Sequence, residues 1–150
     1  MNTHELIARA VIINKENILL CKGITSNHLF FPGGHVEFTE HIEKALAREI
    51  KEECDGDVTK TECMGIVENV WQDGKKQRHE LNVLFRTALK SYHVKSIEKE
   101  LEFHWIPLKK LSKMNIKPVV IPRLIQKWLK NKHIFFVSHI DEHSKKRGKK

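Results

Sequence analysis

The sequence predicts an α/β (α+β) fold, in which a mixed sheet is packed against helices in a single domain. Short β-branched and apolar runs recur along the 150 residues, and two segments change to a helical period. An apolar content of 40% is enough for one hydrophobic core at this length. We find no internal repeat and no linker-like stretch that would divide the chain.

Two strands joined by a turn are predicted near the N-terminus. Residues 7–13 are β-branched and apolar, residues 14–17 are typical of a turn, and residues 18–21 are apolar again. We therefore expect a hairpin here. A third apolar run, over residues 29–31, ends at the Pro-Gly-Gly turn signal of residues 32–34.

The first helix is predicted from Glu40 to Glu53, a segment without Gly or Pro, and Thr39 before it is a good N-cap. An Asp-Gly turn between two later apolar runs is typical of a β-hairpin. The remaining elements are predicted as a strand over 58–71, the turn at 73–74, a return strand over 81–85, a short strand over 103–106, an amphipathic helix over 119–132 and a last strand over 134–137.

The formal net charge of +8 would attract a polyanion, which could be a nucleotide or a nucleic acid. Part of this charge lies in the last ten residues, where five Lys or Arg stand against one Asp and one Glu. We assign residues 1–138 to one domain, and we expect residues 139–150 to form a basic, flexible tail.

We expect a soluble, cytoplasmic protein without a membrane partner. The first residues lack the pattern of a secretory signal, and no apolar run approaches the roughly 20 residues that cross a bilayer. The three cysteines have no C-x-x-C spacing, which favours reduced, buried thiols over a disulfide framework or a zinc site.

Three glutamates stand out on the predicted first helix. Ile42, Leu46, Glu49 and Glu53 are spaced 4-3-4 and share one stripe, so the two acids should face the protein body, with Glu52 beside them. Carboxylates without His or Cys partners favour a hard ion such as Mg2+ or Mn2+, which is commonly shared with substrate phosphates. The spacing alone is equally compatible with an exposed helix without a metal site, on which these acids pair with lysine and arginine neighbours.

The segment from Gly34 to Glu53 resembles the Nudix box, G-x5-E-x7-R-E-U-x-E-E-x-G-U, where U is apolar. Gly34, Glu40 and the run Arg-Glu-Ile-Lys-Glu-Glu of residues 48–53 match it at six fixed positions and at the first apolar one. Residues 31–37, with the sequence FPGGHVE, are similar to the segment that leads into the box in that family. The resemblance spans about residues 6–132 and implies an α/β/α sandwich with a mixed central sheet.

The box departs from its pattern at the end. Asp55 stands where the closing Gly is expected, and Gly56 stands at the apolar position after it. A Gly at the first position usually ends the helix in a left-handed conformation, which Asp tolerates better than most residues. We expect an altered helix end, with Gly56 able to take that conformation one residue later, and unchanged metal ligands.

The resemblance implies a metal site made by Glu49, Glu52, Glu53 and the main-chain carbonyl of Gly34. The bound ion would be Mg2+, with Mn2+ as an alternative. The resemblance also implies that Arg48 donates a charge-assisted hydrogen bond to a helix glutamate and that Glu40 has a supporting or capping role. At Gly33 and Gly34 the backbone would approach the substrate phosphates closely.

The implied reaction is metal-dependent hydrolysis of the diphosphate bond in a nucleoside diphosphate linked to another moiety. Glu52 or Glu53 would accept the proton of the attacking water, unless the base comes from elsewhere in the fold. Candidate substrates are nucleotide sugars, ADP-ribose, dinucleoside polyphosphates, nucleoside triphosphates and capped RNA ends. Relatives that hydrolyse ADP-ribose or dinucleoside polyphosphates carry a Pro or a Tyr, respectively, after the box. Neither residue is found there in this sequence, which makes these two substrate classes less favoured.

Further candidates lie outside the box. Glu80 starts an apolar strand and could be a metal ligand or base, against the alternative of an exposed strand-end charge. Arg9, Phe31 and Trp71 could bind base or phosphate, with core packing as the alternative for the two aromatic residues. Weaker acidic candidates are Glu68, Glu98, Glu100 and Glu102.

Two other functions are weighed against the enzyme. A noncatalytic nucleotide-binding regulator with the same fold would commonly lack box carboxylates, which are all present here. An RNA-end-processing hydrolase would use the basic tail, but no aromatic residue that could stack a base follows Val137. The expected partner is therefore a small nucleotide derivative, ranked above nucleic acid, and homodimers are frequent among relatives of this kind.

Overall fold

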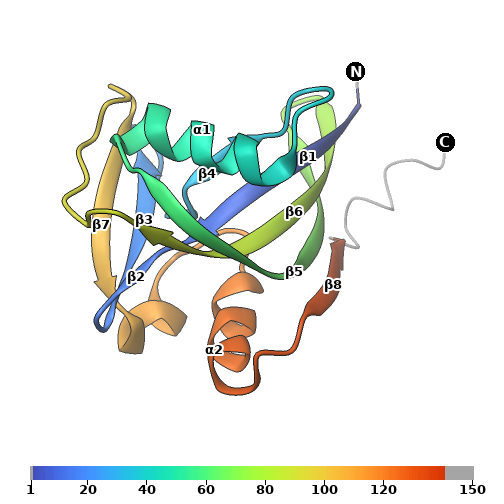
Figure 1. The fold of residues 1–150 in the computed structure, drawn as a ribbon. Helices are drawn as coiled ribbons and strands as arrows, with labels where there is room; N and C mark the ends of the chain where they lie inside the picture. The colour runs from blue at the N-terminus through green and yellow to red at the C-terminus, as the bar shows by residue number, and fades with distance from the viewer. Residues whose placement is uncertain (1, 141–150) are drawn as a thin grey trace, which may run out of the picture.

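The computed structural model describes residues 2–140, and its largest sheet is built around β1 (Thr3–Val11) (Figure 1). β1 pairs in parallel with β6 (Lys76–Leu89) and antiparallel with the short edge strand β4 (Gly33–His35). β5 (Val58–Asp73) and β8 (Phe135–Ile140) complete the order β4-β1-β6-β5-β8. The prediction of a mixed central sheet is therefore confirmed.

A second, three-stranded sheet has the order β2-β3-β7, made by Ile13–Asn14, Asn17–Gly23 and Leu101–Pro107. Only Ile12 separates β1 from β2, so the chain passes from one sheet into the other without a turn. The predicted N-terminal hairpin consists of β2 and β3 alone, because β1 has its partners in the other sheet.

The helices cover opposite faces of the central sheet. α1 (Ile42–Cys54) packs its residues Leu46 and Ile50 on the face that carries Ala8 and Ala10. α2 (Ile121–Asn131) and a 3-10 helix, η1 (Leu108–Lys113), lie on the other side (Figure 1). The predicted layers of helix, sheet and helix are therefore present.

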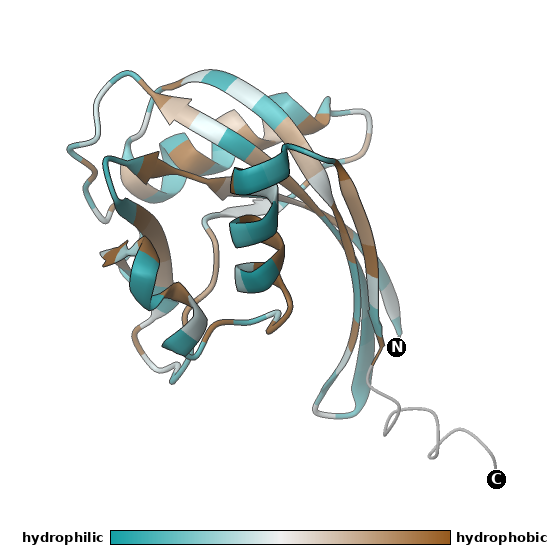
Figure 2. Ribbon diagram, turned by 90° about the horizontal axis from the view of Figure 1, so that it is seen from below, coloured by the Kyte–Doolittle hydropathy of each residue, from teal (hydrophilic) through white to brown (hydrophobic). Residues whose placement is uncertain are grey.

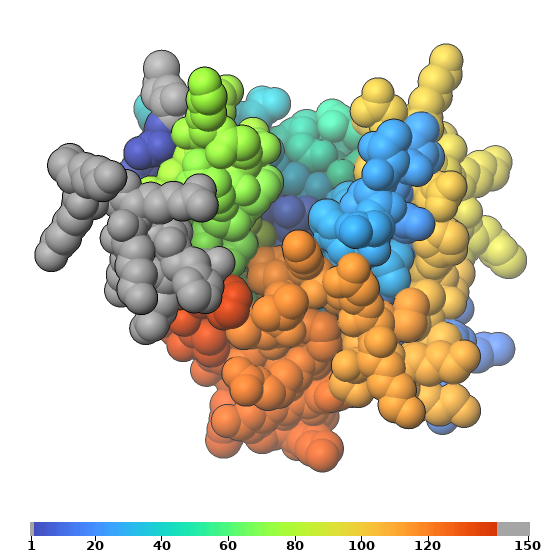
Figure 3. All heavy atoms as spheres, turned by 180° about the vertical axis from the view of Figure 1, so that it is seen from behind, coloured from blue at the N-terminus to red at the C-terminus, as the bar shows by residue number. Residues whose placement is uncertain are grey.

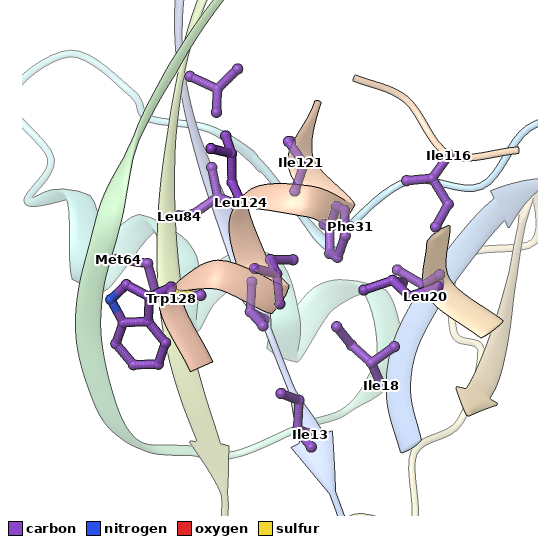
Figure 4. Packing of buried hydrophobic residues seen from close by; sticks show 14 of the residues in the cluster. Ile13, Ile18, Leu20, Phe31, Met64, Leu84, Ile116, Ile121, Leu124 and Trp128 are labelled. Atoms are coloured by element: carbon purple, nitrogen blue, oxygen red, sulfur yellow. The ribbon is translucent and has the colours of Figure 1, made fainter. Parts of the chain in front are cut away.

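The core beneath α2 is made by large apolar side chains from both sheets. Phe31 and Leu84 pack there with Leu124 and Trp128 of α2, and all four are buried (Figure 4). Figure 2 looks onto α2 and shows a largely hydrophilic outer side, as expected for an amphipathic surface helix. Removing such a large apolar residue from the core typically costs about 2–5 kcal/mol.

The start of α1 differs from the prediction. The N-cap is His41, without a side-chain capping bond, and Thr39 lies two residues earlier with a φ of 67°. The carboxylate of Glu40 accepts the N–H of Glu37 and two hydrogen bonds from Arg48, which holds residues 37–40 in a turn outside the helix. The prediction of Thr39 as N-cap is wrong for this reason.

The end of α1 follows the first of the two possibilities raised by the sequence. Asp55 itself adopts the left-handed conformation, with φ 55° and ψ 29°, and its N–H donates to the carbonyl of Lys51. Gly56 does not take that conformation. The ammonium group of Lys51 lies 2.8 Å from Asp55 and 3.1 Å from Asp57, so both acids are also tied to the last turn.

Within residues 2–140, no helix is long and apolar enough to cross a membrane. Of the predicted tail, His139 and Ile140 belong to β8, and residues 141–150 lie outside the described residues.

Candidate functional site

Two glycines of β4 bring the backbone against the glutamates of α1. Gly33 has a φ of 138°, and a Cβ there would lie 2.0 Å from the carbonyl oxygen of Ala8. A Cβ on Gly34 would lie 2.4 Å from the carboxyl carbon of Glu49. Any larger residue at either position would have to displace a neighbour, so the glycines allow this close contact.

Glu53 is the buried acid of the site, with only 7% of its surface exposed. Its Oε2 accepts a 3.3 Å hydrogen bond from the N–H of Gly33. The pKa of Glu53 is raised to about 8, mainly by burial and also by the nearby charge of Glu49, while the Gly33 hydrogen bond and the charge of Arg9 reduce the shift. A cation beside this carboxylate would favour its charged form.

Arg48 holds the acidic residues of the box together. Its guanidinium donates to both oxygens of Glu40, at 2.8 and 3.0 Å, and this pairing lowers the pKa of Glu40 to about 2. Its Nη1 lies 3.0 Å from Glu49 and 3.4 Å from Glu52, and its Nη2 donates to the carbonyl of His35 at 3.2 Å. Arg48 therefore places two helix carboxylates side by side, and Glu40 supports it.

The three box glutamates do not all face the same way. Glu49 and Glu53 contact the glycines of β4, whereas the Glu52 side chain is 52% exposed and contacts Arg48. Within residues 2–140, no group of three or more His, Cys, Asp or Glu side chains is already arranged to hold a metal ion. The donors that are present, two close carboxylates with a third beside them, are nevertheless those that a hard divalent cation prefers.

Beyond the box, a chain of hydrogen bonds leads across the sheet from Arg9. Arg9 Nη1 donates to the carbonyl of Phe31 at 3.1 Å, and its Nε donates to Oδ1 of Asn82 at 3.3 Å. The amide nitrogen of Asn82 donates to Glu80 at 3.3 Å, and the indole N–H of Trp71 donates to Glu80 at 2.8 Å. Three of the predicted outer candidates, Arg9, Trp71 and Glu80, are thereby brought together.

These residues line a pocket of about 500 Å³. In Figure 3 it is the recess between the green residues of the β5–β6 hairpin and the blue segment before β4, with orange residues that precede α2 below it. Lining residues that the sequence did not single out include His28, Phe30, Lys117, Pro118 and Val119. They lie outside the named helices and strands, and nothing in their local sequence indicated a shared pocket.

Of the two alternatives stated for Phe31, the structure has core packing, and the neighbouring Phe30 lines the pocket instead. Phe31, the predicted candidate, has its side chain in the core and offers only its carbonyl to Arg9. The ring of Phe30 lines the pocket, with the Arg9 guanidinium 5.8 Å from its centre. Because successive residues of an extended chain face opposite sides, one of the two had to point to the core, and sequence alone does not say which.

The weaker acidic candidates are spread over the molecule. Glu68 lies on the sheet face opposite the pocket, where it accepts a hydrogen bond from Ser138 at 3.0 Å. Glu102 contacts His104 at 3.3 Å. Glu98 and Glu100 are exposed, but only the charge of Glu98 contributes to raising the pKa of Glu53.

Comparisons with known proteins agree on one family. The family model described as NUDIX domain matches residues 3–125. Among solved structures, a MutT protein from Methanosarcina mazei Go1 is 21% identical with a TM-score of 0.71, covering 86% of this chain and 95% of its own. A MutT NUDIX hydrolase from Burkholderia pseudomallei is 22% identical with a TM-score of 0.60, covering 71% of this chain and 85% of its own.

A third solved structure has a substrate in its name. An ADP-ribose pyrophosphatase from Streptococcus suis 89-1591 is 17% identical with a TM-score of 0.64, covering 90% of this chain and 98% of its own. At these identities the likeness concerns the fold.

Proposed function

The chain belongs to the Nudix family of pyrophosphohydrolases, and on that premise we propose that Glu49, Glu52 and Glu53 serve a metal-dependent hydrolysis of nucleoside diphosphate derivatives. Enzymes of this family generally use divalent metal ions. The proposed ion is Mg2+, with Mn2+ as the alternative, because all the candidate ligands are oxygen atoms.

The contact between Gly33, Gly34 and the helix acids carries this proposal. It holds a buried carboxylate, Glu53, next to a second one, Glu49, where two negative charges repel each other unless a cation lies between them. We propose that the carbonyl of Gly34 completes the set of oxygen ligands. When bound, a divalent cation neutralises charge on phosphate oxygens and promotes the ionisation of water.

The surrounding residues have separate tasks in the proposed reaction. Glu52 is half exposed and is our candidate to accept the proton of the attacking water. The oxygen of that water bonds to one phosphorus, and the bond from this phosphorus to the bridging oxygen breaks. Arg48 positions Glu49 and Glu52, and Arg9, at the wall of the pocket, provides positive charge for a phosphate group.

The pocket beside Arg9 supports a substrate with a nucleoside attached to its phosphates. Its volume of about 500 Å³ is typical of small-molecule sites, and Phe30 and Trp71 give it flat aromatic walls. Of the three similar structures, one names a substrate, ADP-ribose, and at 17% identity this does not assign the moiety on the far side of the diphosphate.

A screen of nucleoside diphosphate derivatives with product analysis tests the proposal. We expect turnover with Mg2+ or Mn2+, complete loss in excess chelator and recovery when the ion is added back. The variant E53Q should lose turnover, whereas E43Q, a change at an exposed glutamate in the first turn of the same helix, should retain it. Turnover that persists in excess chelator would contradict the proposal.

A further inference from the structure

The pocket beside the box glutamates contains one acidic side chain, Glu80. We propose that Glu80 selects the substrate by accepting hydrogen bonds from two adjacent donors on its nucleoside half. This proposal rests on the proposed function, since it names the feature of the substrate that the same site recognises.

Glu80 is held rigidly at the wall of the pocket. It is 8% exposed, and the two hydrogen bonds from Trp71 and Asn82 reach different oxygens of its carboxylate. Asn82 is fully buried, and its own oxygen accepts from Arg9, so its amide nitrogen must point to Glu80. All these residues lie on paired strands of the central sheet, which suits a group that has to recognise a ligand precisely.

The carboxylate of Glu80 retains unused acceptor capacity. Two oxygens offer about four acceptor positions, of which Trp71 and Asn82 occupy one on each oxygen. Within residues 2–140, no Lys, Arg or His nitrogen lies within 4.0 Å of Glu80 to form a salt bridge. A buried acceptor without a salt-bridge partner favours a ligand that brings its own N–H or O–H groups.

The order of groups across the site places the nucleoside next to Glu80. Arg9 lines the same pocket and links the two groups of acids: its strand neighbour Gly33 donates to Glu53 of the box, and its guanidinium is joined to Glu80 through Asn82. A nucleotide whose phosphates reach Arg9 and the box would have its base and sugar at Glu80, against Phe30 and Trp71.

Two parts of a nucleoside carry a pair of adjacent donors. The guanine base has the N1–H beside the 2-amino group, and a ribose has its 2′- and 3′-hydroxyl groups. Adenine places an acceptor, N1, beside its amino group, and uracil and thymine have a single N–H between two carbonyls. A carboxylate that contacts the base therefore favours guanine over the bases that lack the donor pair. One that contacts the sugar favours a ribonucleoside over a nucleoside without the two hydroxyl groups.

Equilibrium binding of nucleoside monophosphates without added metal tests this directly. The probes are GMP, IMP, which lacks the 2-amino group, and 2′,3′-dideoxy-GMP, which lacks both hydroxyls. On the unmodified chain, one of the two omissions should weaken binding by about tenfold. If IMP binds more weakly than GMP, Glu80 contacts the base edge. If the dideoxy nucleotide binds more weakly, Glu80 contacts the sugar. Equal affinity for all three would overturn the proposal, whether or not any variant folds.

The variant E80Q identifies the residue responsible. It should weaken GMP binding by about tenfold and remove the discrimination seen on the unmodified chain. E68Q is the matched control, because Glu68 is a partly buried glutamate on the adjacent strand whose side chain lies on the opposite face of the sheet. If E80Q keeps the same discrimination as the unmodified chain, Glu80 is not the selecting residue.

Kinetics separate this proposal from the proposed function. With a hydrolysed guanosine substrate, E80Q should raise KM while kcat changes little, whereas E53Q should lower kcat. A chain that binds GMP selectively but hydrolyses no nucleotide would contradict the proposed function and leave Glu80 as the selecting residue. If the unmodified chain hydrolyses nucleotides and E80Q has the same KM, only the role of Glu80 is contradicted.

Discussion

The carboxylate of Glu49 lies directly over the α-carbon of Gly34, so close that a single methyl group on Gly34 would stand 2.4 Å from its carboxyl carbon. This contact connects an edge strand of the sheet to the helix that follows it, and it fixes the position of one proposed metal ligand relative to a backbone carbonyl.

Replacing Gly34 with alanine should therefore affect activity more than stability. The new methyl group would push aside the end of a flexible side chain, so the fold should persist, but Glu49 would leave its place. We expect turnover to fall by about 100-fold or more and the thermal midpoint to shift by only a few degrees. G23A is a control at a glycine where the added methyl meets its nearest atom at 3.4 Å.

The variants E52Q and E53Q should each have a kcat lower by more than about 100-fold. Either change removes a proposed ligand or proton acceptor without changing the shape of the side chain. Circular dichroism and the thermal midpoint should show that both variants fold. Wild-type turnover in both would refute their assigned roles.

Arg48 to lysine should lower turnover by about 10- to 100-fold, since an ammonium group cannot reproduce the two parallel bonds to Glu40 and also reach Glu49 and Glu52. Because Arg48 acts through its neighbours, the affinity for Mg2+ should fall along with kcat, which a titration of activity against the ion would measure. Unchanged affinity for the ion would argue that Arg48 acts elsewhere.

The stability of the metal-free chain should depend on the ionisation of Glu53. Its pKa is raised from 4.5 to about 8 in the folded state, so the folded chain holds a proton that the unfolded chain releases. This stabilisation is full below pH 4.5 and is lost as the pH rises towards 8, by up to about 1.4 kcal/mol for each pH unit. Denaturation in chelator at pH 5 and pH 8 measures the loss.

E53Q supplies the comparison for that measurement. Glutamine does not ionise, so its stability should be flatter between pH 5 and pH 8 than that of the unmodified chain. A divalent ion should also flatten the profile, because it stabilises the charged form of Glu53. A profile in the unmodified chain as flat as in E53Q would count against the shifted pKa.

The left-handed residue at the end of α1 gives a stability prediction. D55A places an alanine at a φ of 55° and should lower the free energy of unfolding by about 1 kcal/mol, whereas D55G should cost less because glycine adopts this conformation freely. D57A removes an exposed partner of Lys51 without changing the helix end, and should be nearly neutral. Equal losses in D55A and D55G would instead point to the ion pair of Asp55.

The box residues could be predicted because their signal is local. The residues from Gly34 to Glu53 form one turn and one helix that follow each other in the chain. In the structure, Glu49 and Glu53 contact the glycines, as their spacing requires. The outward position of Glu52 was less predictable, since it depends on Arg48, whose contacts come from a turn outside the helix.

The pocket could be predicted only in part. Arg9, Trp71 and Glu80 were singled out individually, but their hydrogen-bond chain depends on a parallel pairing between strands about 70 residues apart. The second sheet was missed for the same reason, because the apolar runs over residues 7–13 and 18–21 are compatible with one sheet or two. Local pattern specifies that a strand forms, and tertiary packing decides which strand becomes its neighbour.

The passage of the chain through Ile12 from one sheet into the other also bears on how the protein forms during translation. The first 23 residues contribute β1 to the central sheet and β2 and β3 to the second sheet. β2 pairs with β3 and β1 pairs with the nearby β4, but the longer partners of β1 and β3 lie in residues 76–89 and 101–107. As the ribosome synthesises the chain from the N-terminal side, β1 and β3 each keep one apolar edge unpaired until these later strands emerge. Late, long-range pairing of this kind leaves strand edges of a nascent chain exposed to aggregation.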